Sequence, residues 1–163
     1  MSRADAPDAL RALGKRYGIP LTRGLKGEDL DGLLRAHSLA NTWSTLEYAC
    51  HMRDVLQIQH ERLQRALVED GYVPESMRRD ERAVEQRYNE QVPAVVAEEL
   101  ALAATTIAAD LEAFTDADWG RTMTYLYPER AERTLTWVAQ HTVHEGEHHL
   151  LDVGRVLRAA RGR

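Results

Sequence analysis

A cluster of metal-binding side chains lies near the C-terminal end of the chain, in the segment QHTVHEGEHHLLDVG at positions 140–154. Histidine, glutamate and aspartate together make up almost half of this segment. Imidazole and carboxylate groups are ordinary ligands of zinc and related metals, and two of them can share one ion when they lie four residues apart on a helix. The segment therefore indicates metal chemistry, and its stretch His144-Glu-Gly-Glu-His148 reads as the H-E-x-x-H signature of zinc proteases.

The protease interpretation fails on the third ligand and on the helix phase. No glutamate follows Glu147, so the zinc proteases that use a later glutamate ligand are excluded. The metzincin pattern needs glycine and histidine where this chain has Leu151 and Gly154. Because a helix turns by about 100° per residue, His144 and His148 point about 150° or more away from the apolar side of the segment. The protease-like string is thus a coincidence of register.

A different pair points inward. His149 lies within about 50°, and Glu145 within about 90°, of the centre of the apolar side, four residues apart. Helical bundles build metal sites between facing helices, and the best third ligand from elsewhere is His51. A His, Glu, His set leaves a position open for water or substrate, as in catalytic zinc sites. It stays open whether His144 or His148 replaces Glu145 or His149 as a ligand. A di-iron site is set aside, because the other long helices offer no second Glu-x-x-His.

Simpler interpretations of the same residues remain open at this point. His51 can be a hydrogen-bonded core residue, Glu145 can be an exposed partner of His141 or His149, and a histidine-rich helix can be a solvated face. Cys50 adjoins His51, but neighbouring residues diverge by about 100° on a helix, so a Cys–His nucleophile pair is not expected. Cys50 is predicted to be a small core residue.

The elements that must position these residues are predicted to be helices. Apolar residues recur at helical spacing in each of the longer segments, which are bounded by proline, glycine and capping residues. The predicted elements are a short N-terminal helix at about 5–17 ended by Gly18 and Pro20, a broken connection with a short helix in EDLDGLLRAH, a long helix at 43–69, a polar loop or short exposed helix in RDERAVEQRYNEQ, a helix at 93–114, a turn in TDADWGR, an irregular stretch or brief hairpin in TMTYLYPERAER, and a last helix from the cap Thr134 to about 159. Three long helices and a shorter one predict an all-α four-helix bundle forming a single domain over 1–163.

Composition narrows the class of protein. The chain has 163 residues, of which 44% are hydrophobic and 29% charged, as in ordinary globular domains. A net charge of −5 argues against a nucleic-acid partner, despite the basic end RVLRAARGR. No apolar run approaches membrane-spanning length, so no membrane partner is expected. A single cysteine excludes an internal disulfide and, with no secretory signal pattern, favours a cytoplasmic location.

Two segments resemble the DinB-like superfamily over about residues 40–160. TWSTLEYACHMRDVL, at 42–56, is similar to the W-S-x-x-E-x-x-x-H motif of that superfamily's second helix, and HTVHEGEHHLLDVGRVLR is similar to its last-helix motif. Ordinary members carry two histidine ligands there, whereas a thiol-using branch, the mycothiol-dependent maleylpyruvate isomerases, carries E-x-x-x-H-x-x-D. Glu145, His149 and Asp152 match that branch, and the second-helix histidine ligand maps to His51.

The resemblance implies one divalent metal, zinc or nickel first and iron as a further candidate, held by His51, Glu145 and His149. It also implies a thiol S-transferase or isomerase that uses a low-molecular-weight thiol such as mycothiol or bacillithiol on an electrophilic small molecule, and it is compatible with a homodimer. Asp152 and His141 are expected to orient a ligand or a bound water, with a solvated role equally open for His141. No catalytic residue is assigned. The alternatives are a metal-dependent hydrolase and a non-catalytic, dimerising metal-binding stress protein.

Overall fold

The computed structural model describes residues 1–127 and 129–162, and its described part confirms the predicted four-helix bundle. The long helices are α1 (Ala6–Thr22), α3 (Thr45–Val68), α5 (Pro93–Ala113) and α7 (Leu135–Ala160). The shorter elements are η1 (Arg3–Asp5), α2 (Leu30–Arg35), α4 (Arg79–Glu85), η2 (Tyr88–Glu90), α6 (Asp116–Gly120) and the antiparallel strands β1 (Thr122–Tyr125) and β2 (Ala131–Thr134). The structure thus has the predicted bundle, and of the two alternatives for the segment TMTYLYPERAER it has the brief hairpin.

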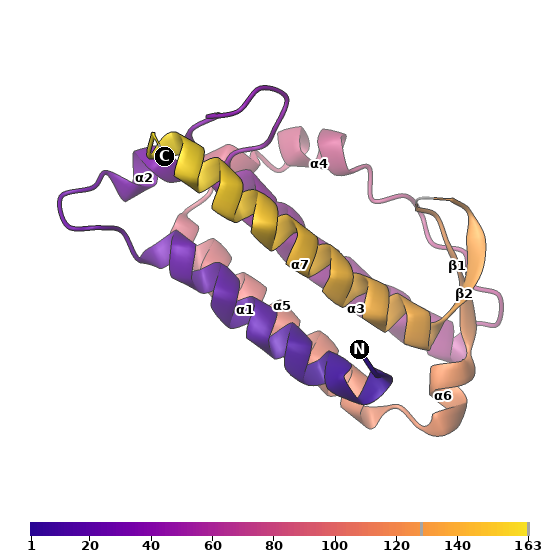
Figure 1. Cartoon of the computed structure of the whole chain (residues 1–163). Helices are drawn as coiled ribbons and strands as arrows, with labels where there is room; N and C mark the ends of the chain where they lie inside the picture. Colours follow the sequence, from indigo (N-terminus) through magenta and orange to yellow (C-terminus); the bar gives the residue numbers. More distant parts are fainter. Residues whose placement is uncertain (128, 163) are drawn as a thin grey trace.

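The long helices do not pack in chain order. Helix α1 packs against α5 and α7, and α3 packs against the same two helices, so α1 and α3 lie diagonally across the bundle (Figure 1). Helices α3 and α7 run antiparallel, because Gln59 of α3 contacts Thr142 of α7 while Tyr48 contacts His149. The hairpin lies at the N-terminal end of α7 (Figure 1). This order places the two helices with the predicted metal ligands side by side.

Capping residues fix where the two functional helices begin. The Ser44 hydroxyl accepts a hydrogen bond from the backbone N–H of Glu47, and the Glu47 carboxylate accepts one from the backbone N–H of Ser44, so a capping box starts α3. The predicted cap of α7 is confirmed, because Thr134 accepts from the N–H of Trp137. Both starts are encoded locally, in the residue types at the helix termini.

Two predicted boundaries are wrong, and both errors have a physical cause. The N-terminal helix continues past Gly18 to Thr22, since Pro20 lies in the last turn, where it removes one hydrogen bond while Leu21 remains buried in the core. The predicted turn in TDADWGR is the short helix α6, begun by a capping box on Thr115. Where the prediction left alternatives, the structure has a helix, α4, in the polar segment and a hairpin after α6.

Helices α1 and α7 approach closely at a glycine. A Cβ added to Gly146 would lie 2.5 Å from Cδ1 of Leu13, a fully buried side chain of α1. The Tyr17 hydroxyl donates a 2.8 Å hydrogen bond to the Gly146 carbonyl, which holds the helices at this separation. The glycine inside the protease-like string therefore allows the close approach of the two helices.

We expect Gly146→Ala to lower the free energy of unfolding by about 1–3 kcal/mol, the usual cost of inserting atoms into a packed core. Urea denaturation measures the change. Gly18→Ala, in α1, is the matched control: among the described residues the added Cβ would meet no neighbouring side chain or element within 4 Å, so the substitution should stabilise the fold by about 0.4–1 kcal/mol. Equal effects of the two substitutions would contradict the close approach at Gly146.

A buried ionic network fixes α3 against its neighbours on the side away from α7. The Asp54 carboxylate, 2% exposed, accepts hydrogen bonds from Arg53 Nε at 2.8 Å, Arg82 Nε at 2.5 Å and the Tyr88 hydroxyl at 2.7 Å. Arg53 also donates to Glu99 of α5 at 2.8 Å. These contacts join α3 to α4, η2 and α5, and so set the rotation of the helix that carries His51.

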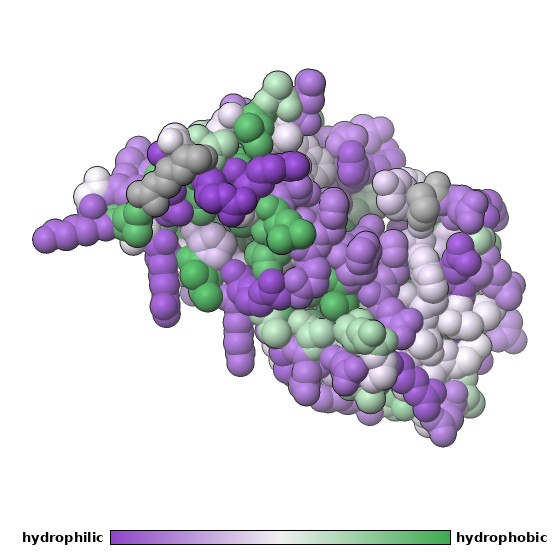
Figure 2. All heavy atoms as spheres, in the orientation of Figure 1, coloured by the Kyte–Doolittle hydropathy of each residue, from purple (hydrophilic) through white to green (hydrophobic). Residues whose placement is uncertain are grey.

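The molecular face seen in Figure 2 is mostly hydrophilic, and its separate apolar patches are divided by polar side chains. Leu151 of α7 and Leu102 of α5 are among the exposed apolar residues, at 72% and 68%. Among the described residues, no helix combines the length and apolarity needed to cross a membrane. The expected homodimer stays a prediction.

Candidate metal centre

A cavity of about 610 Å³ lies between α3, α7 and the hairpin. Its lining comes from α3 (His51, Val55, Ile58, Gln59, Arg62), from α7 (His141, His144, Glu145, His148, His149), from the segment 76–79 and from the residues 125–127 at the end of β1. All three predicted ligands line this cavity. The two helices supply most of the lining, and two connections supply the rest.

His51 and His149 meet across the interface of α3 and α7. Their ring centroids are 5.0 Å apart, with the ring planes at 84°. Trp43 packs against His51 with ring centroids 5.0 Å apart, and Tyr48 packs against His149 at 5.6 Å. These aromatic contacts hold both imidazoles in place. Nδ1 of His51 is buried and has no hydrogen-bond partner among the described residues, which is unusual for a histidine with only a structural role.

The predicted supporting role of Asp152 agrees with its contacts. Its carboxylate accepts a hydrogen bond from Nδ1 of His149 at 3.3 Å and a second one from Arg155 at 2.8 Å. A proton held on Nδ1 leaves Nε2 of His149 with a free lone pair, the state that a metal ligand requires. A carboxylate that orients a ligand imidazole in this way is typical of metal sites.

Glu145 lies one helical turn from both His141 and His149. Its Oε1 is 3.5 Å from Nε2 of His141, and the Glu145 side chain is 24% exposed. The ring of His141 is stacked on Trp137 at a centroid distance of 4.4 Å. His141 is therefore an ordered neighbour of Glu145. Its side chain is 15% exposed, so it is not the solvated histidine that the sequence left open.

The protonation states suit a cation. Burial, helped by the neighbouring His149, lowers the pKa of His51 to about 4, so this imidazole is neutral at pH 7. Burial also lowers the pKa of His149, although Asp152 opposes the shift. Burial tends to raise the pKa of Glu145, but His141, His149 and His51 outweigh it and hold this pKa below its usual value. The three groups thus present two neutral imidazoles and one carboxylate.

The fit of a metal to these residues is supported by chemistry, while the ligand atoms do not yet converge. At the side-chain positions of the described residues, no group of three His, Cys, Asp or Glu side chains could hold a metal ion. The predicted set therefore requires side-chain rotation to close around an ion. The unpartnered Nδ1 of His51, the neutral His149 and the ionised Glu145 are donors that suit zinc, nickel or iron(II). The ligand assignment stays a prediction.

The histidines of the protease-like string lie at the rim of the cavity. His144 is exposed, and the side chain of His148 is 65% exposed, as the helix phase predicts. Both histidines still line the cavity, so they lie closer to the predicted ligands than the helix phase alone suggests.

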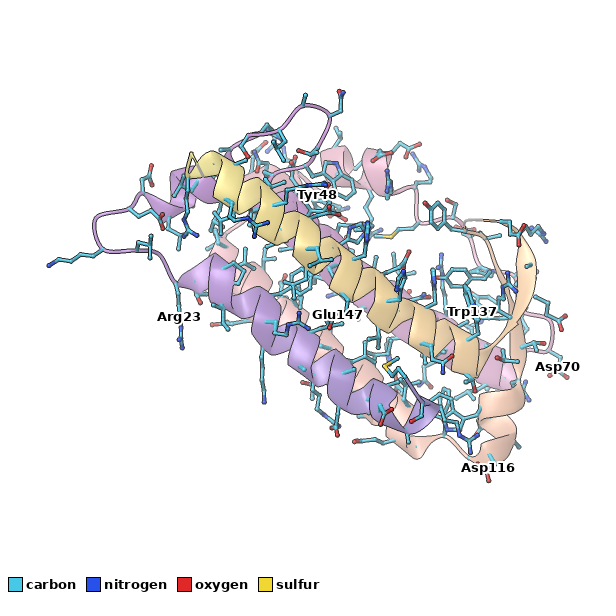
Figure 3. All side chains as sticks on the ribbon, viewed as in Figure 1. Arg23, Tyr48, Asp70, Asp116, Trp137 and Glu147 are labelled. Carbon is cyan, nitrogen blue, oxygen red and sulfur yellow. The ribbon has the colours of Figure 1, made fainter. Side chains whose placement is uncertain are left out.

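Figure 3 shows Tyr48 and Trp137 on the side of α7 away from α1, while Glu147 faces α1, where it pairs with Arg16. Glu147 is thus excluded from the site. Cys50 is fully buried outside the cavity, as predicted.

Gln59, Arg62 and Tyr125 are among the lining residues that the sequence did not reveal. Gln59 donates hydrogen bonds from Nε2 to the Tyr125 hydroxyl at 2.8 Å and to Thr142 at 3.3 Å, and Arg62 lies one turn further along α3. The spacing 51, 55, 58, 59, 62 is a helical stripe that could have revealed Gln59 and Arg62. Tyr125 comes from the hairpin, and no spacing links it to the helices.

The architecture and the cavity together define the class of protein. It is a four-helix bundle in which the neighbouring helices α3 and α7 both contribute histidine or glutamate side chains, the residue types that bind metals, to one cavity. A family model of the DinB superfamily matches residues 22–153, and the chain belongs to this superfamily. The fold is also similar to YfiT from Bacillus subtilis, described as "a probable metal-dependent hydrolase with an unusual four-helix bundle topology". That similarity has a TM-score of 0.82 at 14% identity and covers 96% of this chain and 86% of the other. No curated protein matches significantly.

Proposed function

We propose that the protein is a metal-dependent enzyme that transfers a low-molecular-weight thiol, such as mycothiol or bacillithiol, to an electrophilic small molecule. The observation that carries the proposal is the meeting of His51 and His149, 5.0 Å apart, in a cavity that also contains Glu145. The contact of Asp152 with His149 supports it, because Asp152 completes the E-x-x-x-H-x-x-D pattern of the thiol-using branch.

The metal would be held by His51, Glu145 and His149. A divalent ion at such a site lowers the pKa of a bound thiol or water and supplies a nucleophile at neutral pH. Around it, Asp152 keeps the proton of His149 on Nδ1, and Trp43 and Tyr48 shield the two imidazoles. The cavity volume is that of an ordinary small-molecule site, which leaves room for both a thiol and its acceptor.

Tyr125 can assist the substrate by hydrogen bonding. Its hydroxyl oxygen accepts from Gln59, so its own proton is free to be donated into the cavity. Burial raises the pKa of Tyr125, and Glu145 adds to the shift, so the phenol stays protonated over the physiological range. An oxygen atom that gains negative charge during the reaction would be stabilised by such a fixed donor.

The test uses protein purified without a histidine tag. We expect about one divalent metal per chain, and a cobalt-substituted sample should change its absorption spectrum when mycothiol or bacillithiol is added. The control is the Glu145→Ala protein, which should not bind the cobalt. Adding the thiol to cobalt and this variant should give the same spectrum as adding the thiol to cobalt in buffer alone. An unchanged spectrum of the wild-type protein would reject thiol binding at the metal.

The second candidate is metal-dependent hydrolysis, favoured by the similarity of fold to YfiT. In that case water would occupy the open position, and ester or amide probes would be hydrolysed without any thiol. Full metal occupancy with neither a thiol effect nor hydrolysis would favour the non-catalytic metal-binding alternative. Metal analysis and these two assays therefore separate all three functions.

A further inference from the structure

The cavity is rich in positive charge. Arg62, Arg78 and Arg79 line it, whereas Glu145 is the one carboxylate among its described lining residues. Two of these arginines already have acidic partners: Arg78 lies 3.2 Å from Glu85, and Arg79 lies 3.5 Å from Asp80. The third arginine is different.

Within residues 1–127 and 129–162, Arg62 forms no ion pair within 4 Å. Its Nη2 donates a 2.7 Å hydrogen bond to the backbone carbonyl of Glu75, and this is its one hydrogen bond in the described residues. A guanidinium has five N–H donors in a planar fork, so most of its donor capacity is unused. Burial lowers the pKa of Arg62, with Tyr125, Tyr72 and Glu145 opposing the shift. A half-buried cation with unused donors, at the wall of a cavity, is suited to bind an anion.

Arg62 is at a useful distance from the predicted metal ligands. It lies eleven residues after His51 on the same face of α3, about 16 Å along the helix axis. Between them α3 contributes the apolar Val55 and Ile58 to the wall, together with the amide of Gln59, and Met77 lines the cavity from the segment 76–79. A ligand that reaches from Arg62 to the predicted metal ligands would need an anionic group at Arg62, an apolar body between the two, and a reacting group beside the metal ligands.

We propose that Arg62 binds the carboxylate of the substrate, and that the substrate's apolar body lies along Val55 and Ile58 toward His51. A carboxylate matches the guanidinium fork with two parallel hydrogen bonds, which gives orientation as well as affinity. The position of the reacting end rests on the proposed function, whereas the carboxylate site itself does not.

The test compares benzoate with the neutral benzamide by isothermal titration calorimetry on metal-free and metal-loaded protein. The metal-free wild-type protein should bind benzoate at least about ten-fold more tightly than benzamide, as expected for a charge-assisted pair. Arg62→Gln should remove this preference. Arg158→Gln, which changes an exposed arginine of α7 outside the cavity, should keep it. Circular dichroism checks that both variants fold, and Arg62→Lys, which keeps the charge but loses the fork, should retain part of the preference.

The failures are distinguishable. A benzoate preference that survives in Arg62→Gln, or that appears only when metal is bound, would overturn the carboxylate site and leave the metal and thiol results unaffected. Equal binding of benzoate and benzamide by the wild-type protein would do the same. If the wild-type protein retains no metal but still prefers benzoate through Arg62, the proposed function is overturned and the carboxylate site stands.

Discussion

Glu145→Ala and His149→Ala should each abolish the retention of a divalent metal, with affinity reduced by more than about 100-fold. Substituting residues that merely support a ligand costs about 10- to 100-fold, so the removal of one of three protein ligands must cost more. The measurement is metal content after dialysis, followed by titration of the metal-free protein with zinc. Asp152→Asn should give an intermediate loss of about ten-fold, because it weakens the acceptor that orients His149.

The matched control is His144→Ala, on the same helix and at the rim of the same cavity. We expect it to retain the metal as the wild-type protein does. Retention by Glu145→Ala together with loss in His144→Ala would reverse the assignment and restore the H-E-x-x-H interpretation of the segment. Retention by all variants would reject metal binding through α7 altogether.

Asp54→Ala is expected to destabilise the fold by about 3–5 kcal/mol, the usual cost of removing one partner of a buried ion pair. The substitution removes one of the two carboxylates that pair with Arg53, which is 7% exposed, and it removes the acceptor of the Tyr88 hydroxyl. Urea denaturation measures the effect. Asp70→Ala is the control: Asp70 pairs with Arg121 but its side chain is 98% exposed, so its loss should cost less than about 1 kcal/mol.

The same carboxyl predicts a pH dependence. Burial tends to raise the pKa of Asp54, but the hydrogen bonds from Arg82, Tyr88 and Arg53 prevail, and the folded-state pKa lies below the ordinary value. A lowered folded-state pKa contributes stability that is fully present above the unfolded pKa of about 3.9 and is lost as the pH falls through the folded value. The stability gap between the wild-type protein and Asp54→Asn should therefore shrink on acidification below about pH 4. A gap that stays constant down to acid unfolding would contradict this network.

The start of α7 and the residues on its inward side were predictable, because they depend on local chemistry. Thr134 is a good cap wherever it occurs, and the phase of Glu145 and His149 follows from helix geometry. Ser44 and Thr115 are caps of the same kind, but they were not recognised, so the second long helix was predicted from residue 43 and α6 was predicted as a turn. The end of α1 was not predictable, since burial of Leu21 against other helices overrides a local proline.

The site was predictable in part, for a related reason. His51 and His149 could be paired from the face each occupies and from the family resemblance, but Tyr125 could not be placed. Its position depends on the hairpin folding back over α7, which is a tertiary event without a periodic signal.

The cavity draws its floor from α3 and α7 and its rim from two connections, at residues 76–79 and 125–127. Loops accept substitution and insertion far more readily than packed helices do. Substitutions at Met77 or Tyr127 can therefore change which compounds enter the cavity. The residues around His51 are constrained separately, because they pack in the core. Such an arrangement lets a single scaffold diversify its chemistry quickly without first losing its ability to fold.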